Sequence, residues 1–157
     1  MKTIVALVWL AGSALVAHAT QATITAYRFV DISFEAMRKL TAEECQARYP
    51  QLWTFTCDLP LKQEVKASQT TNAHSATVQL YAEPDAQEPT KTSVKCQVDD
   101  EIKRAVTANS ILRLQTRMSL PSGKPVILFG AFSNSGKVGE TKSEALLYVM
   151  QLDEKKR

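Results

Sequence analysis

Apolar and polar residues alternate along most of this chain, with the period of two that is typical of β-strands. The clearest run is 112–120, where Arg113, Gln115 and Arg117 share one face and apolar residues share most of the other. Similar runs with β-branched and aromatic residues occupy 23–30, 52–57, 62–67, 76–82 and 92–98. We therefore predict mainly antiparallel strands, and we take Arg113, Gln115 and Arg117 as an exposed strand face.

A helical pattern interrupts the strands near the N-terminus. Ser33 can cap a first helix, whose apolar residues recur every three residues. Thr41 and Glu44 have the spacing of a capping box, which predicts a second helical piece that Pro50 ends.

Two strongly apolar segments lie in the C-terminal third. Residues 125–132 are apolar on both faces, which predicts a central strand covered on both sides. Residues 144–152 fit a helix or a strand, and the hairpin signal at 121–124 favours a strand. Of the remaining segments, we predict polar turns or loops at 68–75, 83–89 and 133–139, and a short helix at 99–106.

Together these segments predict an α+β fold. One N-terminal helical segment packs on a mostly antiparallel sheet of about six strands, which a C-terminal β-meander closes. Residues 20–152 form a single domain in this prediction, and residues 153–157 form a charged tail.

The first nineteen residues have the pattern of a signal peptide. Lys2 precedes an apolar stretch, and residues 17–19 fit the A-x-A site of a signal peptidase. Cleavage near Ala19 leaves 138 of the 157 residues. The remaining chain has no apolar run of the about 20 residues that a membrane-spanning helix requires. We therefore expect a periplasmic or secreted protein with no transmembrane segment in the mature chain.

The charge balance limits the kinds of partner that the chain could bind, and the cysteines indicate its redox chemistry. After the loss of Lys2 the chain has 18 basic and 16 acidic residues, a balance that argues against a dedicated nucleic-acid binder. Three cysteines would enter an oxidising compartment. We predict a disulfide between Cys45 and Cys57, which are close in sequence and lie on consecutive predicted elements. We interpret Cys96 as a buried apolar residue, with an intermolecular bridge as the alternative.

Few residues could carry catalysis. His74 is the only histidine left after cleavage, so we expect no two-histidine zinc site and no histidine-based catalytic pair, and we interpret His74 as a surface residue. Residues 130–138 do not fit a phosphate-binding loop, because five residues separate the glycines and valine follows the lysine. A polar turn explains Ser135 and Lys137 better than Ser-Lys catalysis. We therefore expect a protein that is not an enzyme and needs no metal or cofactor.

Residues 111–132 resemble the signature of the outer-membrane secretins, in which a strand with a Thr-Arg pair leads through a glycine turn into an apolar strand with a glycine near its end. The residues that match in type and order are Thr116, Arg117, Gly123 and Gly130. Residues 144–152 resemble the acidic-apolar strand that closes the secretin core. The resemblance implies a small component of a bacterial secretion or pilus assembly, not a pore.

These observations predict a non-enzymatic protein that binds another envelope protein through its sheet. The alternative is a secreted inhibitor or ligand-binding module that acts through a surface loop, either 83–91 or 133–142. The polar residues of the second loop that we consider for binding are Ser133, Asn134, Ser135, Lys137 and Lys142.

Overall fold

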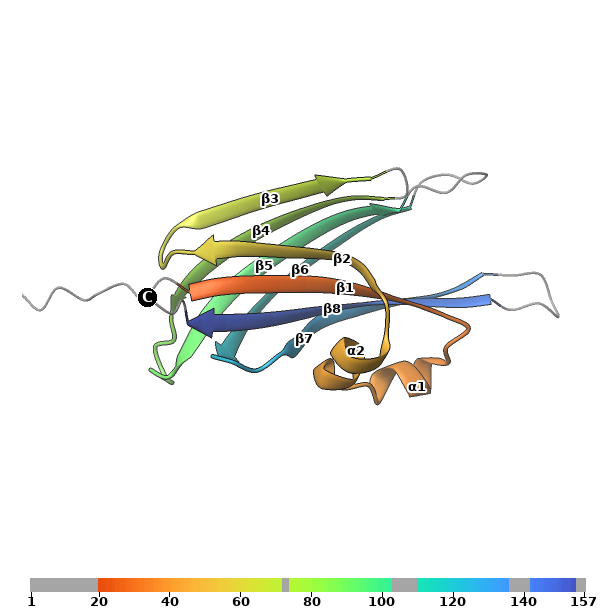
Figure 1. Cartoon of the computed structure of the whole chain (residues 1–157), viewed down its shortest axis with the longest axis horizontal. Helices are drawn as coiled ribbons and strands as arrows, with labels where there is room; N and C mark the ends of the chain where they lie inside the picture. The colour runs from red at the N-terminus through yellow and green to blue at the C-terminus, as the bar shows by residue number, and fades with distance from the viewer. Residues whose placement is uncertain (1–19, 72–73, 103–109, 136–141, 155–157) are drawn as a thin grey trace, which may run out of the picture.

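The computed structural model describes residues 20–71, 74–102, 110–135 and 142–154. They form eight strands and two short helices (Figure 1). The strands are β1 (Thr20–Val30), β2 (Gln51–Leu59), β3 (Glu64–Thr70), β4 (His74–Pro84), β5 (Lys91–Ile102), β6 (Ser110–Pro121), β7 (Val126–Ser135) and β8 (Lys142–Glu154), and the helices are α1 (Phe34–Arg38) and α2 (Ala42–Arg48). Strand therefore dominates the fold, as the alternating pattern predicts.

The strands form two antiparallel sheets that pack face to face (Figure 1). Sheet A has the order β2-β1-β8-β7, and sheet B has the order β3-β4-β5-β6. The pairings follow the chain, except that β8 closes back on β1. Two chain neighbours, β2 with β3 and β6 with β7, are joined by short turns but belong to different sheets. The described strands thus make six of the eight pairings of a closed meander, and β2, β3, β6 and β7 each end a sheet.

The predicted mostly antiparallel α+β fold is therefore correct in its main feature and wrong in its count. The structure has eight strands in two layers, whereas the sequence predicts about six in one sheet. The difference arises because two turns move the chain from one sheet to the other. Such a change of layer leaves no trace in the alternation of a single strand.

The larger core lies between the two sheets. Alternate residues of β4 are buried there, namely Ala76, Val78, Leu80 and Ala82, and they belong to one apolar cluster with residues of sheet A such as Ile24. The polar residues between them face outward, which is the arrangement that a period of two requires in a sheet with one solvated face.

The two helices begin where the sequence predicts. The Ser33 Oγ accepts a hydrogen bond from the Ala36 backbone N at 3.1 Å. Thr41 and Glu44 form a complete capping box, in which each side chain accepts a hydrogen bond from the other's backbone N–H. Neither of these described helices combines the length and the apolarity needed to cross a membrane.

A second apolar core lies between the helices and the outer face of sheet A. Met37 and Cys45 from the helices belong to one buried cluster with Phe29 of β1 and with Leu147 and Val149 of β8. Sheet A is therefore covered on both faces, by sheet B on one side and by α1 and α2 on the other.

β8 is the strand that this arrangement encloses most fully. Residues 145–150 are all buried, and β1 pairs with β8 from Thr20↔Glu154 to Val30↔Glu144. The predicted strand at 144–152 is therefore correct. The central place predicted for residues 125–132 is wrong, because β1 occupies the far side of β8 and leaves β7 at the end of sheet A.

Several local predictions need correction. β3 runs to Thr70 and β4 begins at His74, so the predicted turn over 68–75 is largely strand; hydroxyl groups pair across it, as between Ser68 and Thr77 at 3.0 Å. Residues 99–102 continue β5 instead of beginning a helix, and residues 103–106 lie outside the described residues. β8 includes the first two residues of the predicted tail, 153 and 154, and residues 155–157 are outside the described part.

All three cysteines are free. Cys45 lies in the core beneath the helices and Cys57 packs against the core between the sheets, so sheet A separates them. The predicted Cys45–Cys57 disulfide is therefore wrong, because proximity in sequence does not reveal that the two residues occupy opposite faces. Cys96 is 1% exposed, as expected for a buried apolar residue, and burial raises the pKa of its thiol to about 12.

Candidate functional site at the free edge of strand β7

Four strands end a sheet, and an end strand presents backbone N–H and C=O groups that no neighbour pairs. Natural proteins usually place charged residues on such strands, which discourages pairing with another chain. Three of the four follow this rule: β2 carries Asp58, β3 carries Glu64 and Lys66, and β6 carries two arginines. β7 carries no charged residue between 126 and 135, and this sets it apart.

β7 pairs with β8 from Val126 to Ser135, and its register shifts between Ile127 and Phe129. After this irregularity Phe129 and Ala131 lie on the side of the inter-sheet core, while Gly130 and Phe132 lie on the side of the helices. Apolar residues thus occupy both faces of the edge strand. In Figure 1 the outer ends of β7 and β8 extend away from sheet B.

Gly130 gives this edge an exposed position without a side chain of its own on the outer face of sheet A. It is exposed, and a Cβ atom added there would lie 2.5 Å from Leu147 Cδ2 and 3.3 Å from the Leu146 carbonyl oxygen. A side chain at this position would therefore require Leu147 to shift, so the close packing of Leu147 against β7 favours glycine here.

An aromatic contact lies two residues farther along β7. Phe132 of β7 meets Phe34 of α1 edge-to-face, with ring centroids 5.6 Å apart. Phe34 keeps 48% of its surface exposed, and the Arg38 guanidinium lies 5.8 Å from its ring centroid. The edge thus continues onto an exposed apolar surface of α1.

β6, which precedes β7 across the turn at 122–125, is a charged edge strand. Arg113 Nε donates to Asp99 Oδ1 at 2.7 Å, and Arg117 pairs with Glu83 and donates to Ser93 Oγ at 3.1 Å. The predicted face of Arg113, Gln115 and Arg117 is exposed. Its two arginines, however, are already paired within sheet B.

The predicted loop 133–142 falls partly within strands. The backbone of Ser133, Asn134 and Ser135 pairs with β8 at the end of β7, and Lys142 opens β8. Lys137 lies outside the described residues. The three polar residues that were expected in a loop therefore extend the β7 edge.

A buried polar cluster between the sheets was missed by the sequence analysis. Asp100 is fully buried, and its Oδ2 accepts hydrogen bonds from Trp53 Nε1 at 2.9 Å and from the Tyr148 hydroxyl at 3.0 Å. Burial, and then the neighbouring Asp100, raises the pKa of Tyr148. One signal could have revealed the cluster: Asp100 continues the inward phase of Val94, Cys96 and Val98 on β5.

His74 is also inside the protein, with 4% of its surface exposed. Its Nδ1 is 3.0 Å from the Thr71 hydroxyl. The interpretation of His74 as a surface residue is therefore wrong, because it opens β4 in the inward phase instead of lying in a loop. Within the described residues, no group of three histidine, cysteine or acidic side chains could hold a metal ion.

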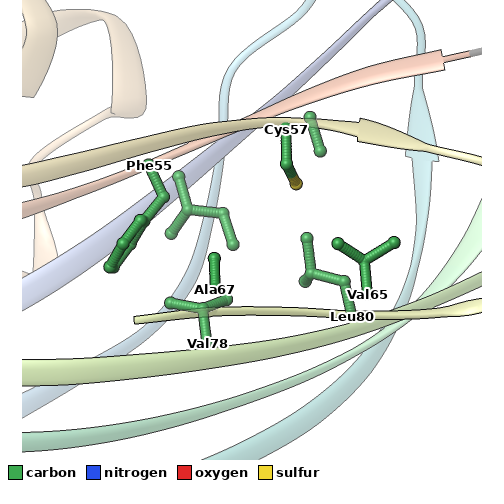
Figure 2. A pocket seen from close by; sticks show the side chains of 8 residues that line it. Phe55, Cys57, Val65, Ala67, Val78 and Leu80 are labelled. Atoms are coloured by element: carbon green, nitrogen blue, oxygen red, sulfur yellow. The ribbon is translucent and has the colours of Figure 1, made fainter. Parts of the chain in front are cut away.

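A pocket opens between β2 and β3, where the two sheets meet without pairing. Figure 2 shows its apolar lining, which includes Phe55 and Cys57 from β2 and Val65 and Ala67 from β3. The space admits no water-sized sphere. Burial, and then Asp58, raises the pKa of the Cys57 thiol. We interpret this pocket as core packing and not as a ligand site.

Comparison with known proteins finds little sequence relationship. No protein-family model matches the sequence, and no curated protein matches it. The structure is similar to the secretin InvG of the Salmonella SPI-1 type III secretion injectisome: residues 176 to the end in the open-gate state match 88% of this chain and 58% of that chain, at 6% identity and a TM-score of 0.44. The InvG secretin-domain β-barrel matches 88% of this chain and 61% of that chain, at 6% identity and a TM-score of 0.43. These values confirm a weak structural resemblance to secretins, over less than two thirds of the InvG chains.

Proposed function

We propose that this chain is an exported, non-enzymatic protein that binds a further protein chain in the cell envelope by adding a β-strand at the free edge of β7. One observation carries the proposal: β7 ends sheet A, is apolar on both faces and has no charge. In strand addition the backbone groups of the edge supply affinity, and side chains on the two faces supply specificity. The apolar residues of β7 and the exposed ring of Phe34 suit this mode of binding.

Export is part of the proposal and has its own test. Thr20, the first residue after the predicted cleavage site, already pairs with Leu59 on one side and Glu154 on the other. Cleavage near Ala19 would therefore leave every described strand complete. N-terminal sequencing of the protein from a periplasmic extract should begin at or next to Thr20. Recovery of the chain from the cytosol with Met1 in place would contradict export.

The binding proposal is tested by photo-crosslinking in an exporting host. A photoreactive phenylalanine analogue replaces Phe132 in one variant and Val65 in another; both residues are half-buried in edge strands. We expect a covalent adduct from position 132, and none from position 65. Loss of the adduct when Ala131→Lys is added would show that it forms through the β7 edge. Adducts from position 65 alone, or from neither position, would contradict the proposal.

A second candidate function, a ligand-binding module, has one observation in its favour. A cavity of about 400 Å³ lies beside the predicted loop 83–91 and is lined by Pro84, Pro89 and Lys91 together with Thr20 and Glu154. Crosslinking from a photoreactive residue at Thr90, with none from position 132, would favour this function over strand addition.

A further inference from the structure

We infer that the partner strand at this edge is β7 of a second copy of the chain, in an antiparallel pair centred on Ala131. This inference rests on the proposed function, because it requires the β7 edge to be open to strand addition. It goes further by naming the occupant and the register. The two copies would then share one continuous sheet, with a twofold axis between the two β7 strands.

The faces of the strand limit the possible registers. Residues directly opposite each other in an antiparallel pair lie on the same face of the sheet, so β7 can pair with its own copy only about an axis that passes through a residue. With Ala131 on the axis, Phe132 of each copy lies opposite Gly130 of the other. Both residues belong to the outer face of sheet A. The twofold axis therefore repeats the Phe132–Gly130 contact, so it occurs twice at one interface.

The contact between Phe132 and Gly130 is complementary in shape. Gly130 is exposed and offers no side chain of its own, while Leu147 Cδ2 reaches the place that its Cβ would occupy. An aromatic ring from the opposite strand can lie across such a glycine and cover it. Here the ring would also pack against Leu147, so the exposed Gly130 with Leu147 beside it forms a contact surface for the partner's Phe132.

Charge favours this edge for self-pairing and disfavours its neighbour. β7 brings no like charges together, because residues 126–135 include none. The same operation on β6, centred on Gln115, would set Arg113 opposite Arg117 of the second copy, and like charges directly opposite are unfavourable. Self-association should therefore select β7 and leave β6 solvated.

The test is the oligomeric state of the full protein purified from an exporting host. Sedimentation analysis over about two decades of concentration should show a reversible dimer. Ala131→Glu places two carboxylates next to each other across the axis. It should raise the dissociation constant of the dimer by about tenfold or more. Ala67→Glu is the matched control, since Ala67 is a half-buried alanine of the edge strand β3 that lines the apolar pocket between β2 and β3, and it should leave the dimer unchanged.

A disulfide crosslink between copies provides a second test if the Ala131→Glu variant does not fold. In a Cys57→Ser background, Ala131→Cys should form a disulfide between copies under mild oxidation, and Ala67→Cys should not. A monomer at all concentrations, or a dimer that Ala67→Glu weakens and Ala131→Glu does not, would overturn the inference. A monomer that still gives adducts of other proteins from position 132 would overturn self-pairing alone and leave the proposed function standing.

Discussion

β7 and β8 are neighbours of similar apolar character that hold opposite positions in the molecule. β8 has a paired strand on each side, sheet B on one face and two helices on the other, and its residues 145–150 are all buried. β7 has a strand on one side only, and most of its apolar residues are half-buried. The comparison teaches that apolar content alone does not decide a strand's place. The number of paired neighbours decides whether a strand is enclosed in the core or keeps a free edge.

The largest expected difference between the two strands is in stability. Leu147→Ala in β8 should lower the free energy of unfolding by about 2 to 5 kcal/mol, because the cavity forms in a closed core. Ile127→Ala in β7 is the matched change: Ile127 packs against the same apolar cluster but is only half-buried. Urea denaturation should show a clearly smaller loss for Ile127→Ala. Equal losses would mean that β7 is enclosed as fully as β8.

Gly130 tests how closely the two strands pack. Gly130→Ala should destabilise the protein by about 1 to 3 kcal/mol, because the new methyl group meets Leu147. The double variant Gly130→Ala with Leu147→Ala removes that clash, so the two losses should not add. Additive losses would show that the close approach of Leu147 is not what requires glycine.

Tyr148 gives β8 a buried hydrogen bond to Asp100 in sheet B. Tyr148→Phe removes one of the two hydrogen bonds to Asp100 Oδ2 and leaves the one from Trp53. The loss should be about 1 to 2 kcal/mol, measured by thermal unfolding near pH 7. Tyr148→Phe should not change the edge, so the crosslinking yield from position 132 should persist.

The pH dependence of the same variant follows from the raised pKa of Tyr148. The folded protein keeps the phenol proton to a higher pH than the unfolded chain, whose pKa is near 10.0. The stability that this group contributes is therefore fully present below pH 10 and is lost as the pH rises above that value. Urea titrations above pH 10 should fall more steeply for the wild type than for Tyr148→Phe. Parallel curves would contradict the raised pKa.

The sequence predicted much of the fold and little of the site. Alternation located most strands, and Ser33 and Thr41 located both helix starts, because these signals are local. The place of β7 could not be predicted, since it depends on β1 pairing with β8, more than a hundred residues away along the chain. The same limit explains Cys45 and Cys57, whose faces depend on the covering helices. Gly130 is an exception, because a glycine inside an apolar strand by itself suggests a bulge or close packing, and Leu147 packs closely against it.

The smallest expected effect concerns the ion pair between Arg28 of β1 and Glu144, near the N-terminal end of β8. Arg28 Nε donates to Glu144 Oε1 at 2.9 Å, and the arginine side chain is 44% exposed. Arg28→Ala should change the free energy of unfolding by no more than about 0.5 kcal/mol, because solvent screens such a pair. A loss as large as that of Leu147→Ala would mean that an ion pair holds β8 in the centre of sheet A. We expect instead that enclosure holds it there, and that β7 stays at the edge because none of the strands in the described part of the chain pairs with its far side.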